Sequence, residues 1–131
     1  MPHILIVDDD SDLREVLERF LSIKGHQVYS VGNGRGAIDV LDRQSIDLVI
    51  TDILMPDMDG YELISALRQR PDSPRIIAMS GGSGRLDRDY LLRMARTMKV
   101  DRLLEKPLKL ATVDAAISEV LEGVTPDAAV D

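Results

Sequence analysis

Three short runs of consecutive apolar residues narrow the folds open to this chain: Ile4–Val7, Leu48–Ile50 and Ile76–Met79. Such runs, in which polar and apolar residues do not alternate, are typical of strands covered on both faces in a parallel sheet. Two further runs, Gln27–Val31 and the residues around Leu103, contain more polar side chains. We expect these two runs at the edges of the sheet, because edge strands are less completely covered.

A segment with apolar residues at helical spacing follows each of these five runs. In chain order, the segments carry Leu13, Ala37, Leu63, Met94 and Val113. Repeated alternation of strand and helix predicts a parallel sheet with right-handed crossovers and helices on both faces. With the most apolar strands in the middle, the pattern favours strand order 2-1-3-4-5, a flavodoxin-like, doubly wound α/β fold with five strands and five helices.

The first predicted helix has recognisable ends. Asp12, followed three residues later by Glu15, resembles a capping pair at its start. Gly25 is expected to end it, because glycine readily adopts the left-handed conformation that follows many helices. The length of 131 residues suits one domain, which we place at residues 1–122, with residues 123–131 as a flexible C-terminal tail.

The composition excludes several kinds of site. The chain has no cysteine, which rules out disulfides and thiolate metal sites, and its two histidines, His3 and His26, lie far apart, so no zinc site is predicted. The formal net charge of −7 argues against a nucleic-acid surface, which would need clustered Lys and Arg. No apolar segment approaches membrane-spanning length, and we expect a cytoplasmic location.

Acidic, hydroxyl and basic side chains stand directly after four of the predicted strands. They are Asp8, Asp9 and Asp10 after the first, Asp52 at the end of the third, Ser80 after the fourth and Lys106 after the fifth. In an open α/β sheet, ligands bind beyond these carboxyl ends, and Asp8, Asp9 and Asp52 would meet at the switch point. Converging carboxylates repel one another unless a cation neutralises them. Mg²⁺, usually held by one or two carboxylates and a phosphate, is the predicted cofactor.

A phosphate in this site would give the remaining groups a role. Lys106 can balance the charge of one phosphoryl oxygen, and the Ser80 hydroxyl can donate a hydrogen bond to another. Asp52 is the predicted nucleophile, whose in-line attack would give an acyl phosphate. The residues alone therefore predict a site that handles phosphoryl groups with Mg²⁺.

Four motifs, in this order, resemble the response-regulator receiver domain of two-component signalling: ILIVDDD, DLVITDILMPDMDG, IIAMSGG and LLEKPL. The resemblance runs from about Ile4 to Leu121 and implies that Asp52 is the phosphoacceptor for a histidine kinase or histidine phosphotransfer protein. It also implies the other site residues: Asp8 and Asp9 as the acidic pair of the metal site, Asp9, Asp52 and the Leu54 carbonyl as Mg²⁺ ligands, Ser80 as the switch hydroxyl, and Lys106, before a cis bond to Pro107, as the phosphate-sensing lysine. A receiver catalyses transfer to itself and loses the phosphoryl group by slow self-dephosphorylation, without being a classical enzyme.

Two features depart from the family pattern. Leu103 stands three residues before Lys106, where the family usually has Tyr or Phe, so the aromatic half of the switch is missing. The separation between Ser80 and Lys106 is a few residues longer than usual, and the excess is most easily placed in Gly81–Arg85. Because glycines permit backbone mobility, we predict that this loop is the moving part of the switch.

The helix expected after that loop is basic, with Arg85, Arg88, Arg93, Arg96 and Lys99 against Asp87 and Asp89. In the receiver family, the surface of the fourth helix, fifth strand and fifth helix commonly meets partners. We hypothesise that these arginines meet an acidic partner, or a second copy in a homodimer formed through that surface. No output region follows Leu121, so the chain is expected to act alone as a shuttle or protein-binding switch.

Two other functions stay open at this point. Asp8-Asp9-Asp10 also reads as the D-x-D motif of haloacid-dehalogenase-type phosphatases, with Asp8 as nucleophile and Asp10 as acid. That reading lacks a later acidic pair and a cap domain, and it leaves Asp52 unexplained. The second alternative is a binding module that no longer needs phosphate, a possibility raised by Leu103.

Overall fold

The computed structural model describes residues 1–53, 60–81 and 88–123. Strands and helices alternate in this order: β1 (His3–Val7), α1 (Ser11–Ile23), β2 (Gln27–Val31), α2 (Gly34–Arg43), β3 (Leu48–Asp52), α3 (Gly60–Arg68), β4 (Arg75–Ser80), α4 (Arg88–Met98), β5 (Arg102–Glu105) and α5 (Leu110–Leu121). Within the described part of the chain, no helix combines the length and apolarity needed to cross a lipid bilayer. The predicted tail lies outside the described residues apart from Gly123, and its flexibility stays a prediction.

The five strands form one parallel sheet in the order β2-β1-β3-β4-β5. This result confirms the predicted strand order and the flavodoxin-like, doubly wound α/β fold. The strands β1, β3 and β4 lie inside the sheet and are almost wholly buried, as their continuous apolar runs require. β1 and β3 meet at the switch point, where Ile6 pairs with Ile50 and Val7 with Thr51.

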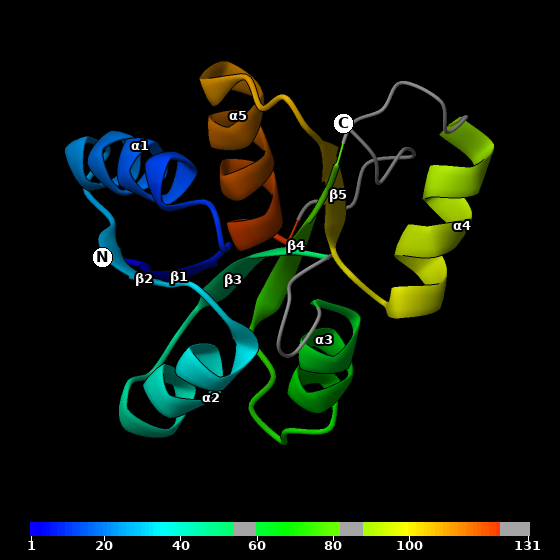
Figure 1. The fold of residues 1–131 in the computed structure, drawn as a ribbon, viewed down its shortest axis with the longest axis horizontal. Helices are drawn as coiled ribbons and strands as arrows, with labels where there is room; N and C mark the ends of the chain where they lie inside the picture. The colour runs from blue at the N-terminus through cyan, green and yellow to red at the C-terminus, as the bar shows by residue number, and fades with distance from the viewer. Residues whose placement is uncertain (54–59, 82–87, 124–131) are drawn as a thin grey trace.

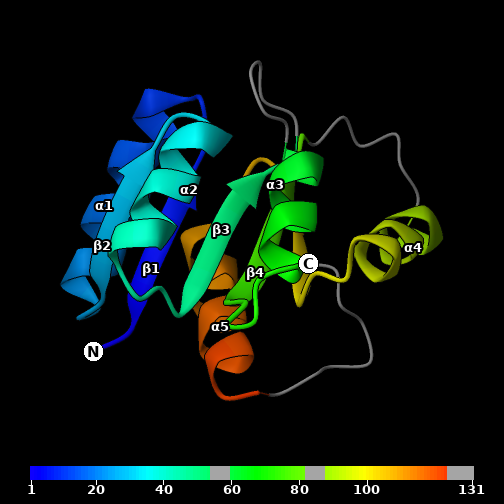
Figure 2. The same cartoon turned by 90° about the horizontal axis from the view of Figure 1, so that it is seen from below.

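The sheet separates two apolar cores, because successive residues of a strand point to opposite faces. Leu5 and Val7 face one core, and Ile4 and Ile6 face the other. Helices complete each core together with the other strands: Ala37, Leu63, Leu67, Ala95 and Met98 from α2, α3 and α4 lie in the first core, and Leu17, Leu21, Val113 and Ile117 from α1 and α5 in the second. Figures 1 and 2 show α1 and α5 on one face of the sheet and α2 and α3 on the other.

The start of α1 differs from the prediction. Asp10 is its N-cap, and Oδ1 of Asp10 accepts hydrogen bonds from the backbone N–H groups of Asp12 (3.0 Å) and Leu13 (3.2 Å). The capping pair expected from Asp12 and Glu15 is therefore wrong. The physical reason is that an N-cap needs extended backbone, which Asp10 has (φ −81°, ψ 104°), whereas Asp12 already lies within the helix.

Two helices end in the same hydrogen-bonding motif with different residues at its left-handed position. Gly25 follows α1 with φ of 95°, as predicted, and Lys99 follows α4 with φ of 58°. The N–H groups of each residue and its successor donate to carbonyls in the last turn: Gly25 to Ser22, His26 to Leu21, Lys99 to Arg96 and Val100 to Ala95. Lys99 carries a Cβ where this conformation favours glycine, so its backbone is strained.

A carboxylate joins three segments at the amino edge of the sheet. Asp101, just before β5, accepts the N–H of Ile76 at 2.7 Å and lies 3.2 Å from Nη2 of Arg68 and 3.7 Å from Nη1 of Arg75. Nε of Arg68 also donates to the Lys99 carbonyl at 2.7 Å. We call the contacts of Asp101 with Ile76, Arg68 and Arg75 the Asp101 clamp. It ties the end of α3 and the start of β4 to the turn between α4 and β5.

Candidate functional site

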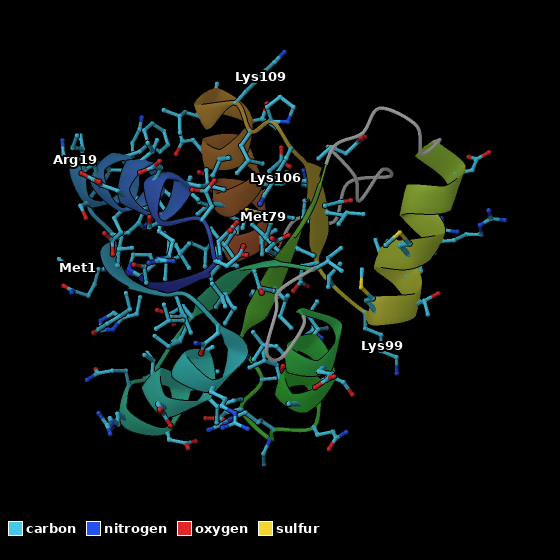
Figure 3. All side chains as sticks on the ribbon, viewed as in Figure 1. Met1, Arg19, Met79, Lys99, Lys106 and Lys109 are labelled. Atoms are coloured by element: carbon cyan, nitrogen blue, oxygen red, sulfur yellow. The ribbon has the colours of Figure 1, made fainter. Side chains whose placement is uncertain are left out.

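The predicted site residues stand at one edge of the sheet because all five strands run in the same direction. Asp52 and Ser80 are the last residues of β3 and β4, and Asp8 and Lys106 directly follow β1 and β5. The side chain of Lys106 is labelled near the centre of Figure 3, close in that view to Met79, the residue of β4 that pairs with Asp52. Four separate segments thus contribute to this edge, as the sequence predicted.

Three carboxylates converge there. One oxygen each from Asp8, Asp9 and Asp52 can be chosen so that all lie within 4.8 Å of one another. Asp8 is fully buried and Asp52 is 7% exposed, whereas Asp9 is open to solvent. We call these three side chains the acidic cluster. An all-oxygen set with one accessible member suits a hard divalent cation that keeps part of its water shell, and the cluster therefore fits Mg²⁺.

Lys106 pairs with two members of the acidic cluster. Its Nζ donates to Oδ2 of Asp8 at 2.8 Å and lies 3.4 Å from Oδ2 of Asp52. Burial acts to lower the pKa of Lys106, but the hydrogen bond to Asp8 and the charges of Asp52 and Asp8 outweigh burial and raise the pKa above its ordinary value. Lys106 therefore stays protonated and offsets part of the repulsion between the carboxylates.

The hydroxyl residue of the predicted site is linked to this lysine through the backbone. Ser80 is 8% exposed, and its carbonyl accepts the N–H of Lys106 at 2.8 Å. The peptide bond between Lys106 and Pro107 is cis, as expected. Gly81 is exposed, whereas the rest of the predicted moving loop, residues 82–85, lies outside the described residues. The Leu54 carbonyl, predicted as a metal ligand, also lies outside them, and both roles stay predictions.

Gly60 lies directly against the backbone of Asp52, a close approach that the sequence did not reveal. Its N–H donates to the Ile53 carbonyl at 2.6 Å, so α3 begins directly against the end of β3. A Cβ at residue 60 would overlap the carbonyl oxygen of Asp52 and lie 2.6 Å from Cα of Ile53. The pair Asp59-Gly60 has the composition of a turn, and local composition contains no sign of this close approach.

Leu103 and the basic helix can also be placed. Leu103 is fully buried in the core that faces α2, α3 and α4. Arg93, Arg96 and Lys99 are exposed on α4 or just after it. Arg85 lies outside the described residues, as does the side chain of Arg88. A contact of these cations with an acidic partner or a second copy stays a prediction.

Comparison with known proteins agrees with this arrangement. A model of the response regulator receiver domain matches residues 4–118 of the chain. The transcriptional regulatory protein CpxR of Escherichia coli K12 is 36% identical over 121 residues, which are 92% of this chain and 50% of that protein. The chain thus spans about half the length of the curated relatives it matches.

Solved structures share the same fold. The signal receiver domain of a signal transduction histidine kinase from Syntrophus aciditrophicus has a TM-score of 0.81 and 33% identity, and the match covers 95% of this chain and 92% of that one. The chemotaxis protein CheY4 of Vibrio cholerae has a TM-score of 0.82, with coverage of 92% and 98%. At 23% identity, the similarity to CheY4 shows the fold alone.

Proposed function

Because this chain belongs to the response regulator receiver domain family, we propose that Asp52 accepts a phosphoryl group from a phosphohistidine donor. The main observation in support of this proposal is that Asp8, Asp9 and Asp52 converge beside Lys106 at the carboxyl edge of the sheet. One cation next to three carboxylates leaves the cluster negative, and such a cluster is tolerated when a divalent cation and an incoming phosphoryl group share it.

In the proposed reaction, an Oδ of Asp52 attacks the phosphorus of a phosphorylated imidazole. The new P–O bond forms as the P–N bond breaks, its electron pair stays on the imidazole nitrogen, and that nitrogen takes up a proton to give neutral histidine. Two hydrogen-bond donors of this chain, Lys106 and Ser80, would contact the transferred phosphoryl group. Lys106 would exchange part of its contact with Asp52 for a phosphoryl oxygen, and the Ser80 hydroxyl would donate to another.

The acidic cluster would hold Mg²⁺ through Asp8, Asp9 and Asp52, with the Leu54 carbonyl as a further predicted ligand. When bound, the ion supplies positive charge that neutralises the phosphoryl oxygens during transfer. The protein keeps Asp52 in place: its backbone is paired with β4, and Thr51 Oγ1 donates to the Asp52 carbonyl at 2.9 Å. The chain therefore acts as its own phosphotransfer catalyst without being a classical enzyme.

The finer biological role follows from this chemistry. A histidine kinase or histidine phosphotransfer protein is the proposed donor, and a cytoplasmic location is proposed because such donors carry their phosphohistidine there. The downstream protein would bind a surface that changes near Ser80 and Lys106 after phosphorylation. A homodimer through α4, β5 and α5 is one form that this output could take.

Incubation with phosphoramidate and Mg²⁺, followed by mass mapping of the modified residue, tests the proposal. Phosphoramidate contains the P–N bond of a phosphohistidine, and we expect one phosphoryl group on Asp52. Asp52→Asn should abolish the label, whereas Asp39→Asn, an exposed change on α2, should leave it. Label on Asp8 instead would support the phosphatase alternative, and unlabelled wild-type protein would support the phosphate-independent module.

A further inference from the structure

We propose that Arg14 is a positioning residue for the acidic cluster, because its guanidinium holds the backbone of Asp8 and lies beside Gly32, just after β2. The proposal rests on the proposed function, since it concerns the same Mg²⁺ and phosphoryl site. Arg14 lies on α1 and is separate from both the acidic cluster and Lys106. Its role is to fix where a ligand carboxylate stands.

The contact with Asp8 is direct. Nη1 of Arg14 donates a hydrogen bond to the Asp8 carbonyl at 2.6 Å. Other bonds hold the rest of Asp8: its N–H donates to Val31 O at 3.2 Å, Oδ1 accepts the Asp10 N–H at 2.9 Å, and Oδ2 accepts Lys106 Nζ at 2.8 Å. Among these partners, Arg14 is the one that binds the main-chain oxygen, so it fixes the peptide that leads into Asp9.

The guanidinium also lies against a second loop. A Cβ added to Gly32, just after β2, would stand 3.2 Å from Nη1 and 3.8 Å from Cζ of Arg14. These distances place the guanidinium beside the Gly32 backbone, where a Cβ would be in tighter than ordinary van der Waals contact with it. The Asp8 N–H donates to the carbonyl of Val31, the last residue of β2, so the loop after β1 is held close to the end of β2, with the Arg14 guanidinium beside both.

The helix places Arg14 where such a side chain can reach back. Asp10 caps α1, and the Arg14 N–H donates to the Asp10 carbonyl at 3.1 Å, which puts Arg14 at the end of the first turn. Side chains of helical residues point toward the helix N-terminus, which here is the carboxyl edge of the sheet. Arginine suits the position because its rigid fork of donors remains charged at every relevant pH.

Two effects of Arg14 on cation binding have opposite signs. Its positive charge repels a metal ion, so removal of the charge alone would tighten Mg²⁺ binding. Its hydrogen bond holds the loop that carries Asp8 and Asp9, so loss of the bond would weaken Mg²⁺ binding, because the ligands would have to be ordered on binding. We infer that the positioning effect is larger than the charge effect. Whether Mg²⁺ affinity falls or rises when Arg14 is replaced distinguishes the two.

The test is the dissociation constant for Mg²⁺, measured by calorimetry and by the shifts of the amide resonances of residues 8–10. Arg14→Met should weaken binding on the order of 10-fold. Arg19→Met is the matched control: it removes the same charge from the same helix at a side chain that is 78% exposed and paired with Glu15, and it should leave the constant unchanged. Arg14→Lys keeps the positive charge and can still donate a hydrogen bond, although from a shorter side chain, and should restore part of the affinity.

Gly32→Ala provides an independent route, because its Cβ would lie 3.2 Å from Nη1 of Arg14, and the guanidinium would have to shift by a few tenths of an ångström. We expect a smaller loss of Mg²⁺ affinity in Gly32→Ala than in Arg14→Met, and no additional loss when the two are combined, since both changes act on the same contact. Gly32→Ala alone still tests the inference if Arg14→Met fails to fold. Folding of Arg14→Met is judged by its far-UV circular dichroism and its unfolding curve without Mg²⁺.

If wild-type protein binds Mg²⁺ and is labelled on Asp52, but Arg14→Met binds the ion equally well or more tightly, this inference is overturned and the proposed function is left intact. Additive losses in the double variant would also overturn it. Wild-type protein that neither binds Mg²⁺ nor takes label would overturn the proposed function and, with it, the role of Arg14.

Discussion

Lys106 reaches back across the sheet to Asp8, 98 residues earlier in the chain, and its Nζ lies 2.8 Å from Oδ2 of that fully buried carboxylate. The pair connects the loop after the edge strand β5 to the loop after the central strand β1. Because Asp8 and Asp52 raise the pKa of Lys106 against the effect of burial, the lysine carries more affinity for its proton in the folded protein than in the unfolded chain.

This pair predicts a pH dependence with a definite sign. A raised pKa stabilises the fold fully below the ordinary lysine value of 10.5, and that stabilisation is lost as the pH rises through the raised value. The free energy of unfolding, measured in urea, should therefore fall more steeply above this pH for wild type than for Lys106→Met. Lys109→Met, at an exposed lysine of the same loop, should follow the wild-type curve. A constant difference between wild type and Lys106→Met at all pH values would contradict the prediction.

Gly60→Ala should destabilise the protein by about 1–3 kcal/mol, because the new Cβ would overlap the Asp52 carbonyl and force α3 away from β3. Chemical denaturation measures the loss. Since the Asp52 backbone must shift, labelling by phosphoramidate should also slow. Gly81→Ala is the matched change, because a Cβ there meets no atom within 4 Å, and its effect should stay within about 0.5 kcal/mol.

Lys99→Gly should stabilise the fold by about 0.5–1 kcal/mol. The left-handed backbone costs a residue with a Cβ about 1–2 kcal/mol, and the greater freedom of unfolded glycine offsets part of the gain. Lys99→Ala keeps the Cβ and should bring no comparable gain, which separates backbone strain from loss of the lysine side chain. Equal melting temperatures for the glycine and alanine variants would argue against strain at φ of 58°.

Mg²⁺ should raise the stability of wild type and leave Asp9→Asn nearly unchanged. Ligand at about 100 times its dissociation constant adds about 2.7 kcal/mol to the free energy of unfolding. Without metal, Asp9→Asn should be at least as stable as wild type, because one of three repelling carboxylates has been neutralised. Thermal unfolding with and without the ion measures both effects, and a variant that is stabilised as much as wild type would remove Asp9 from the ligand set.

Leu103→Tyr, which restores an aromatic residue at this position of β5, should cost about 1–3 kcal/mol. Leu103 is fully buried among the side chains that face α2, α3 and α4, and a larger ring would overpack that core. Leu103→Met has a similar volume and should cost less than about 1.5 kcal/mol. Urea denaturation compares the two, and a tyrosine variant as stable as wild type would show that the core around Leu103 adapts readily.

The sheet and most of the candidate site could be predicted because their signals are local. A continuous apolar run that ends in Asp52, or that precedes Asp8, identifies a buried strand and the group at its carboxyl end in one stretch of sequence. The strand order then followed from which runs were diluted by polar residues. No contact between distant residues had to be known for either step.

Other features could not be predicted because they depend on contacts between segments far apart in the chain. The partner of Lys106 is Asp8 as well as Asp52, and the role of Gly60 depends on how closely α3 approaches β3. No local sequence pattern indicates the role of Arg14, because its hydrogen bond to the Asp8 carbonyl depends on the folded shape of the loop after β1. The prediction of the N-cap of α1 was wrong for a different reason. Asp10 and Asp12 are both good caps by residue type, and backbone conformation decides between them.

The Asp101 clamp lies at the amino edge of the sheet, away from the acidic cluster, and this separation has a consequence in the cell. Substitution of Asp101 should increase the unfolded fraction, so that proteases lower the abundance of a protein whose proposed phosphoacceptor, Asp52, is intact. Substitution of Asp52 should leave a protein that persists at normal abundance but no longer responds to its donor. Immunoblotting would thus distinguish a strain that has lost the molecule from a strain that keeps a silent one.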